Sequence, residues 1–75
     1  MEIRIEGVLK SWNKERGFGF IEPLSGGGQD IFVHASDFPR QGGAPRPGER
    51  LTFEIGLNAE GKKKALQVRR PGQRR

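Results

Sequence analysis

The 75-residue sequence contains no cysteine and no tyrosine, and it has a single histidine, His34. Without thiols the chain can form neither a disulfide framework nor a cysteine-ligated zinc site. A lone imidazole also lacks the neighbours that a metal site or a nucleophile–base pair requires, so we expect no metal, no cofactor and no enzymatic activity. No apolar run approaches the roughly 20 residues of a membrane-spanning helix. We therefore expect a soluble, cytoplasmic domain without a small-molecule substrate.

Acidic residues are absent from the C-terminal part of the sequence. The formal net charge is +5, from 14 basic and nine acidic side chains, but seven of the basic ones and none of the acidic ones follow residue 61. Residues 1–61 thus hold seven basic against nine acidic side chains, a formal charge of −2. A basic composition is typical of nucleic-acid binders. Here the basic excess lies after residue 61, so net charge does not locate a binding face on residues 1–61. Specific residues have to identify that face.

Glycine and proline are abundant, with 12 and five copies, and no segment keeps a helical spacing of apolar residues. Alternation typical of β-strands occurs in five segments, residues 3–12, 17–22, 30–34, 51–55 and 64–69. A long loop over 39–48 separates the third from the fourth. Five short strands favour a closed barrel, because closure removes exposed edges. We expect one all-β domain over residues 1–70 and a basic disordered tail or truncated linker over 71–75.

The second and third strands form a hairpin around a turn at 25–28 and divide their side chains between two faces. One face carries three phenylalanines and the histidine, and the other carries aliphatic side chains: Phe18, Phe20, Phe32 and His34 against Ile21, Ile31 and Val33. We predict that the aliphatic face is the core, because glycines alternate with the rings and pack a core poorly. Three rings exposed together then indicate a binding surface, on which unpaired bases could stack.

The same residues carry a resemblance to a known family. Lys10-Ser11-Trp12-Asn13, Arg16-Gly17-Phe18-Gly19-Phe20-Ile21 and Asp30-Ile31-Phe32-Val33-His34 resemble the bacterial cold-shock domain. The resemblance covers about residues 5–69 and weakens after Ser36. It implies an OB-fold barrel of five antiparallel strands that binds single-stranded DNA and RNA and acts on RNA as a chaperone.

Position by position, the resemblance implies stacking by Phe18, Phe20, Phe32 and His34. It also implies that Lys10 and Arg16 flank the rings as contacts to phosphates or base edges. Asn13 is interpreted as a loop residue that can also hydrogen-bond a base edge. Lys62 and Lys63, with the adjoining lysine, either attract phosphates or solubilise a turn, and the sequence leaves both open.

Several residues depart from the family pattern. Where the family has two adjacent aromatic residues, this chain has Ser11 and then Trp12, and Ala35 stands where many members have phenylalanine. The 42–44 region lacks a further aromatic residue. Alternation from Lys10 puts Trp12 on the outer face, so we favour a fourth stacking ring over a structural lid at the barrel edge. With fewer rings, we predict weaker binding or a shorter footprint than a fully aromatic relative shows.

Other expectations concern the core and the partners. Phe38 and Phe53 are interpreted as core residues. Single-stranded RNA or DNA is the expected partner, and a protein-interaction module is the alternative, because OB folds also present aromatic patches to proteins. A membrane is an expected partner only if the chain continues into a further C-terminal part. We expect a monomer, with a strand-exchanged dimer as the alternative.

Overall fold

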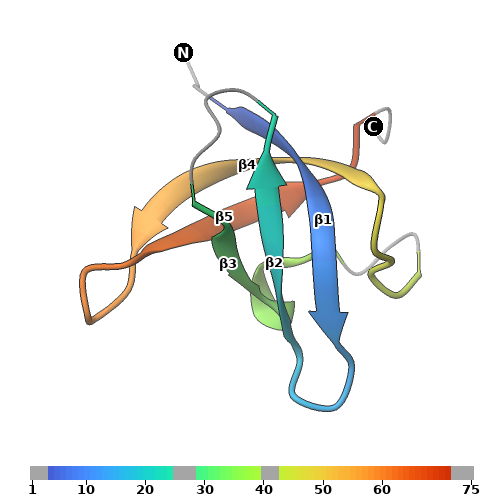
Figure 1. Cartoon of the computed structure of the whole chain (residues 1–75), viewed down its shortest axis with the longest axis horizontal. Helices are drawn as coiled ribbons and strands as arrows, with labels where there is room; N and C mark the ends of the chain where they lie inside the picture. The colour runs from blue at the N-terminus through green and yellow to red at the C-terminus, as the bar shows by residue number, and fades with distance from the viewer. Residues whose placement is uncertain (1–3, 25–28, 40–42, 72–75) are drawn as a thin grey trace.

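The computed structural model describes residues 4–24, 29–39 and 43–71. It contains five strands and one short 3₁₀ turn: β1 (Ile5–Asn13), β2 (Phe18–Pro23), β3 (Ile31–His34), η1 (Ala35–Asp37), β4 (Arg50–Leu57) and β5 (Lys63–Arg69) (Figure 1). The predicted strands are confirmed with ends shifted by a few residues. The start of the first strand at residue 3, the turn at 25–28, part of the 39–48 loop and most of the predicted tail lie outside the described residues. No described helix could span a membrane.

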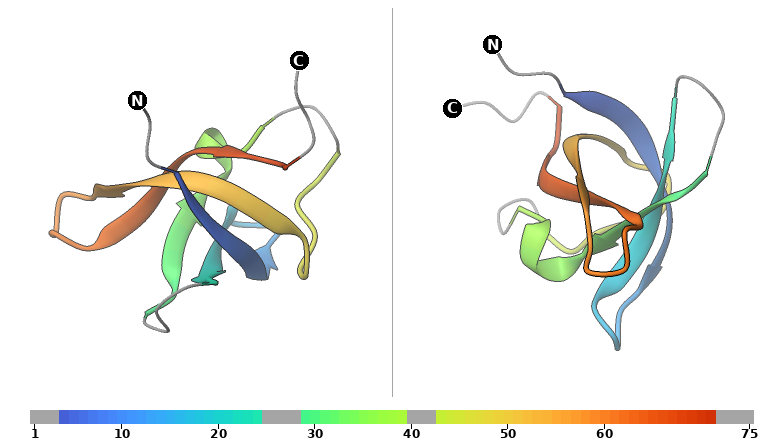
Figure 2. Two further views of the ribbon diagram at one scale, coloured as in Figure 1. Left: turned by 90° about the horizontal axis from the view of Figure 1, so that it is seen from above. Right: turned by 90° about the vertical axis from the view of Figure 1, so that its left-hand side faces the viewer.

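The strands close into a barrel in the order β1-β2-β3-β5-β4. Four of the pairings are antiparallel, and the fifth, between β3 and β5, is parallel. The expectation of antiparallel pairing is therefore wrong at this one seam. The reason is geometric, because strand direction cannot alternate all the way around a closed ring with an odd number of strands. Figure 2 shows β4 and β5 as a long hairpin that crosses the sheet of β1, β2 and β3.

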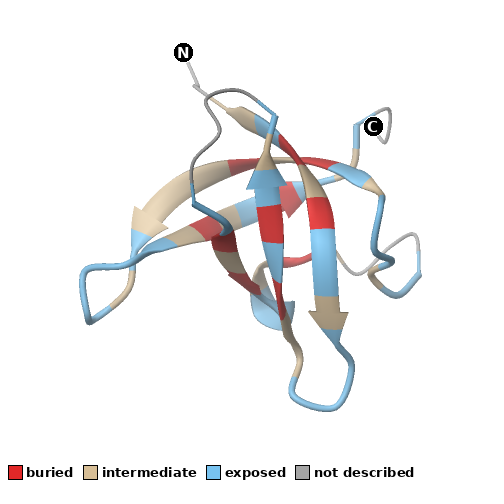
Figure 3. Cartoon of the chain, in the orientation of Figure 1, coloured by how far each residue is buried: buried red, intermediate tan, exposed pale blue. Residues whose placement is uncertain are grey.

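The barrel interior is formed by nine buried apolar side chains from every strand and from the segment after η1. They are Leu9, Ile21, Ile31, Val33, Phe38, Leu51, Phe53, Ala65 and Val68. The aliphatic face of β2 and β3 therefore is the core, as alternation predicts, and Phe38 and Phe53 are core residues. No polar side chain is buried among the described residues. Figure 3 shows buried positions alternating with exposed ones along β2 and with an intermediate one along β3.

The segment that leads into β4 is attached to the end of β5 through Arg70. Its guanidinium donates to Glu49 at 2.8 Å and to the carbonyl oxygen of Gly43 at 3.1 Å, and it lies 5.3 Å from the ring centroid of Phe38. Both side chains of the ion pair are half-buried, with 13% of Arg70 and 23% of Glu49 exposed. Burial raises the pKa of Glu49, but hydrogen bonds and charge from Arg70 and Arg46 outweigh it and hold the pKa below its usual value. This ion pair thus fixes the loop against the barrel.

Candidate nucleic-acid interface

Three phenylalanine rings form one cluster on the outer face of β2 and β3. The ring centroids of Phe18 and Phe32 are 5.6 Å apart, those of Phe20 and Phe32 are 6.0 Å apart, and those of Phe18 and Phe20 are 6.2 Å apart. The rings meet edge to face or tilted, at angles from 32° to 83°, which is the packing that aromatic quadrupoles favour. Phe20 keeps 37% of its surface exposed. The structure therefore places these rings on the predicted face.

The strand register sorts the outer face into two rows that run across the sheet. Partners directly opposite each other on neighbouring strands point to the same face. The first row joins β1, β2, β3 and β5 through Ser11, Phe20, Phe32 and Lys64. The second row joins β1, β2 and β3 through Asn13, Phe18 and His34. The rings are thus flanked on both sides by polar side chains.

His34 ends β3 and caps the 3₁₀ turn that follows. Its Nδ1 accepts a hydrogen bond from the backbone N–H of Ser36 at 3.1 Å and lies 3.0 Å from the Ser36 hydroxyl oxygen. With Nδ1 acting as an acceptor, the neutral imidazole carries its proton on Nε2. The ring is exposed and directly opposite Phe18. His34 therefore extends the aromatic face with a ring whose orientation is fixed locally.

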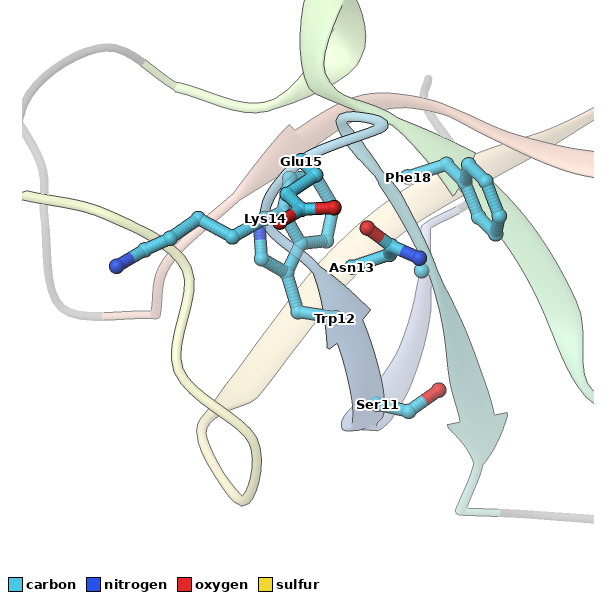
Figure 4. A pocket seen from close by; sticks show the side chains of 7 residues that line it. Ser11, Trp12, Asn13, Lys14, Glu15 and Phe18 are labelled. Carbon is cyan, nitrogen blue, oxygen red and sulfur yellow. The ribbon is translucent and has the colours of Figure 1, made fainter.

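Trp12 does not lie on this face. The prediction that alternation places it on the outer face together with Lys10 is therefore wrong. A register shift in β1 between Leu9 and Ser11 inserts one residue, and Lys10 and Ser11 are both exposed. Such a bulge reverses the alternation beyond it. Trp12 then pairs with Gly19 on the core side. Figure 4 shows the indole on one side of the β1–β2 hairpin and Phe18 on the other.

The indole instead covers one end of the barrel, which is the alternative that the sequence left open. Trp12 is half-buried, packs against the core cluster, and lies 5.5 Å from Phe38 between ring centroids. Gly19 makes room for it, because a β-carbon there would collide with the Ser11 carbonyl oxygen and lie 2.7 Å from the Trp12 Cε3 atom.

Lys10 stands at the bulge on the exposed side, where its ammonium group lies 3.2 Å from a carboxylate oxygen of Asp30. Both side chains are more than a third exposed, so the pair contributes little to stability and can exchange for a phosphate or a base edge. Lys10 and Asp30 thus lie at the edge of the ring cluster.

The β1–β2 turn carries Asn13 and Arg16, both exposed. The Asn13 side-chain oxygen accepts a hydrogen bond from the backbone N–H of Arg16 at 3.0 Å, and its carbonyl oxygen accepts one from Gly17 at 2.8 Å. Gly17 has a positive φ of 75°, which suits glycine. Asn13 therefore orders the turn, the loop role that the sequence favours, while its outer-face position beside Phe18 leaves the amide group near the rings.

A groove of about 640 Å³ separates the rings from the turn between β4 and β5. Its lining comes from both sides: Phe20, Phe32, Gln29 and Asp30 from β2, β3 and the segment before β3, and Asn58, Gly61, Lys62 and Lys63 from the β4–β5 turn. The fold therefore brings Lys62 and Lys63, which are remote in sequence, beside Phe20 and Phe32.

Sequence reasoning missed three residues of this surface. Gln29 lines the groove, and Ser11 and Lys64 lie in the same row as Phe20 and Phe32. The sequence pattern marks Ser11 only as a missing ring and Lys64 only as part of a charged run. The register of β1 against β2 places Ser11, and the register of β3 against β5 places Lys64. Gln29 lies before β3 and not in a strand, so alternation could not have placed it.

The fold and this surface define a class: a small closed β-barrel with a solvent-facing aromatic patch and basic side chains beside it. The 'Cold-shock' DNA-binding domain family matches residues 5–71. The chain belongs to this family, whose members are nucleic-acid-binding domains, and the resemblance in the strand motifs is thereby confirmed.

Relatives in plants and bacteria share the sequence at moderate identity. Glycine-rich protein 2 of Nicotiana sylvestris is 38% identical over 69 residues, covering 91% of this chain and 32% of that protein. A cold shock protein of Arthrobacter globiformis is 45% identical over 58 residues, covering 75% of this chain and 84% of that protein. The chain thus spans about a third of the plant relative and most of the bacterial one.

A solved structure shares the fold. The Drosophila Unr structure CSD456 superposes with a TM-score of 0.73 at 17% sequence identity, covering 99% of this chain and 30% of that one. At this identity the likeness concerns the fold alone.

Proposed function

We propose that this domain binds single-stranded nucleic acid by stacking unpaired bases on Phe18, Phe20, Phe32 and His34. The observation that carries the proposal is the cluster of three rings on the outer face of a well-packed barrel, where Phe20 is 37% exposed and Phe18 and Phe32 are half-buried. These rings are not needed to fill the core, because nine other apolar side chains form it. Base–aromatic stacking contributes about 1–3 kcal/mol per base and accepts every base. A surface of this kind therefore favours binding that depends little on sequence.

Stacking on a sheet requires bases that are neither paired nor stacked on each other. In a duplex the base faces are covered, so the domain is expected to prefer single strands over duplexes of the same sequence. A ligand that binds only the open form of a structured RNA shifts the equilibrium toward that form. RNA chaperone activity in the cytoplasm follows from this preference as part of the proposal.

The test compares fluorescence anisotropy of labelled oligothymidine with the wild type and with the Phe20→Ala/Phe32→Ala variant. Two lost stacking rings are expected to weaken binding by at least about 30-fold. Leu24→Ala is the matched control, because Leu24 is also an exposed apolar side chain, 50% exposed, and lies outside the ring cluster. Trp12 fluorescence is unsuitable as the readout, since the indole lies on the other side of the hairpin.

Equal binding by the ring variant and the control would contradict stacking on these rings. Absence of binding to any single strand by the folded wild type would favour the alternative that the aromatic patch docks a protein.

A further inference from the structure

Lys64 continues the row that holds Phe20 and Phe32. It is the partner of Phe32 across the parallel seam between β3 and β5. Lys64 is half-buried, whereas Lys62 and Lys63 are exposed. A lysine whose stem lies along a sheet can keep its charged end in water. The row therefore passes directly from an aromatic to a cationic side chain.

The turn before β5 holds the other two lysines in a defined place. The Asn58 side-chain oxygen accepts hydrogen bonds from the backbone N–H groups of Glu60 at 2.8 Å and Lys62 at 2.9 Å. The Asn58 backbone N–H donates to the Lys62 carbonyl oxygen at 2.9 Å, and its own carbonyl oxygen accepts from Gly61 at 2.9 Å. Gly61 has a φ of +81°. The turn is thus fixed by four hydrogen bonds and a glycine conformation.

The charges around the groove leave these lysines available for an anionic ligand. In the described part of the chain, no ion pair involves Lys62, Lys63 or Lys64. Of the acids nearby, Asp30 is paired with Lys10, and Glu60 is exposed at the turn. One wall of the groove therefore holds two aromatic rings together with Gln29 and the paired Asp30, and the wall that faces it holds Lys62 and Lys63.

We propose that Lys62, Lys63 and Lys64 form a phosphate-contacting wall, so that a bound strand lays its bases on the rings and its backbone along the start of β5. This inference rests on the proposed function and assigns the phosphodiester groups a direct contact. It differs from two other roles that a lysine run can have, long-range attraction and solubility. Contacts between these lysines and the phosphates would offset part of the binding free energy that is missing because Ser11 is not a stacking ring. This electrostatic contribution weakens as the salt concentration rises.

The first measurement is the salt dependence of oligothymidine affinity. Each phosphate neutralised on a single strand contributes about 0.7 to the slope of log K against log salt concentration. The Lys62→Gln/Lys63→Gln/Lys64→Gln variant is therefore expected to lose about 2 units of slope. Between 50 and 200 mM salt, the wild type should lose about 20-fold more affinity than this variant. The corresponding triple arginine variant should keep the slope of the wild type, which separates charge from side-chain shape.

Arg69→Gln provides the matched control, because Arg69 is an exposed cation on the same strand, opposite Thr52 at its far end. This variant should keep the wild-type slope apart from a small general effect of net charge. If Arg69→Gln lost as much slope per removed charge as the lysine variant, direct phosphate contact by the lysines would be contradicted. The lysines would then act only through the overall charge of the domain. Melting temperatures near that of the wild type establish that each variant is folded.

A second measurement uses an uncharged peptide nucleic acid oligomer with the same thymine bases. Wild type and lysine variant should bind it equally, while Phe20→Ala/Phe32→Ala should still weaken binding. A lysine effect on the uncharged ligand would contradict phosphate contact.

With the phosphodiester ligand, direct contact predicts that the lysine variant dissociates faster than the wild type. A decrease confined to the association rate would show long-range attraction alone and overturn the inference. If Phe20→Ala/Phe32→Ala bound as tightly as the wild type, the proposed function itself would be contradicted.

Discussion

Trp12 lies directly opposite Gly19 across the β1–β2 ladder. The indole occupies the space that a side chain at position 19 would fill, because a β-carbon there would collide with the Ser11 carbonyl oxygen and approach the Trp12 ring. One glycine therefore lets β1 and β2 approach each other and seats the tryptophan at the barrel end. Because Phe18 and Phe20 flank Gly19 on the opposite face, the same glycine separates a structural aromatic residue from the exposed rings.

Replacing Gly19 with alanine should destabilise the fold by about 1–3 kcal/mol, the usual cost of overpacking a filled interior. Chemical denaturation followed by circular dichroism measures the change. Gly56→Ala is the comparison, because the nearest atoms to the new methyl group there all belong to the Leu66 side chain and none to the backbone, and it should cost less. Equal effects at the two positions would argue against a rigid contact at Gly19.

Trp12 should report folding and not ligand binding. Its ring packs against Phe38, so Trp12→Phe should lower the free energy of unfolding by about 1 kcal/mol or more through lost burial. Oligothymidine affinity should stay within about threefold of the wild type, since no stacking ring is lost. A drop of tenfold or more, about one stacked base, under conditions where the variant is fully folded would place Trp12 in the interface.

A ring added at Ser11 should strengthen binding. Ser11 is exposed and pairs with Phe20 on the outer face, so Ser11→Trp extends the row by one stacking platform. About a tenfold gain in oligothymidine affinity is expected, within the range for one stacked base. Ser11→Leu adds apolar surface without an aromatic face and serves as the control. A similar gain in both variants would attribute the effect to apolarity instead of stacking.

The Glu49–Arg70 pair should make stability depend on pH. The folded state holds the pKa of Glu49 below its usual value of 4.5. The ion pair therefore contributes fully above that usual value and is lost as the pH falls through the folded-state pKa. Glu49→Gln should cost about 1 kcal/mol at pH 7, the net contribution of a typical intramolecular hydrogen bond, and progressively less in acid.

Glu60→Gln is the charge-matched control for this measurement, because Glu60 is exposed and forms no ion pair among the described residues. Its effect on the denaturation free energy should be small at every pH. A Glu49→Gln effect that stays constant from pH 7 down to pH 3 would contradict the role assigned to the ion pair.

Most of the fold could be predicted because β2 and β3 are regular. Within a regular strand, alternation alone separates Phe18 and Phe20 from Ile21, and the core and the ring face follow. At Lys10 and Ser11 the same rule fails, because a bulge adds a residue and nothing in the local pattern marks it. That one seam must be parallel follows from the odd number of strands, whereas its place between β3 and β5 and the pairing of Phe32 with Lys64 depend on a strand order and register that only tertiary structure sets.

The most direct test of stacking on the outer face is an NMR titration of the ¹³C,¹⁵N-labelled domain with a short oligothymidine. Ring protons of Phe18, Phe20 and Phe32 should shift strongly, as expected when bases lie on them, and the Trp12 indole resonance should move little. Shifts centred on Trp12, Phe38 and Arg70, with the three phenylalanine rings unchanged, would contradict the account.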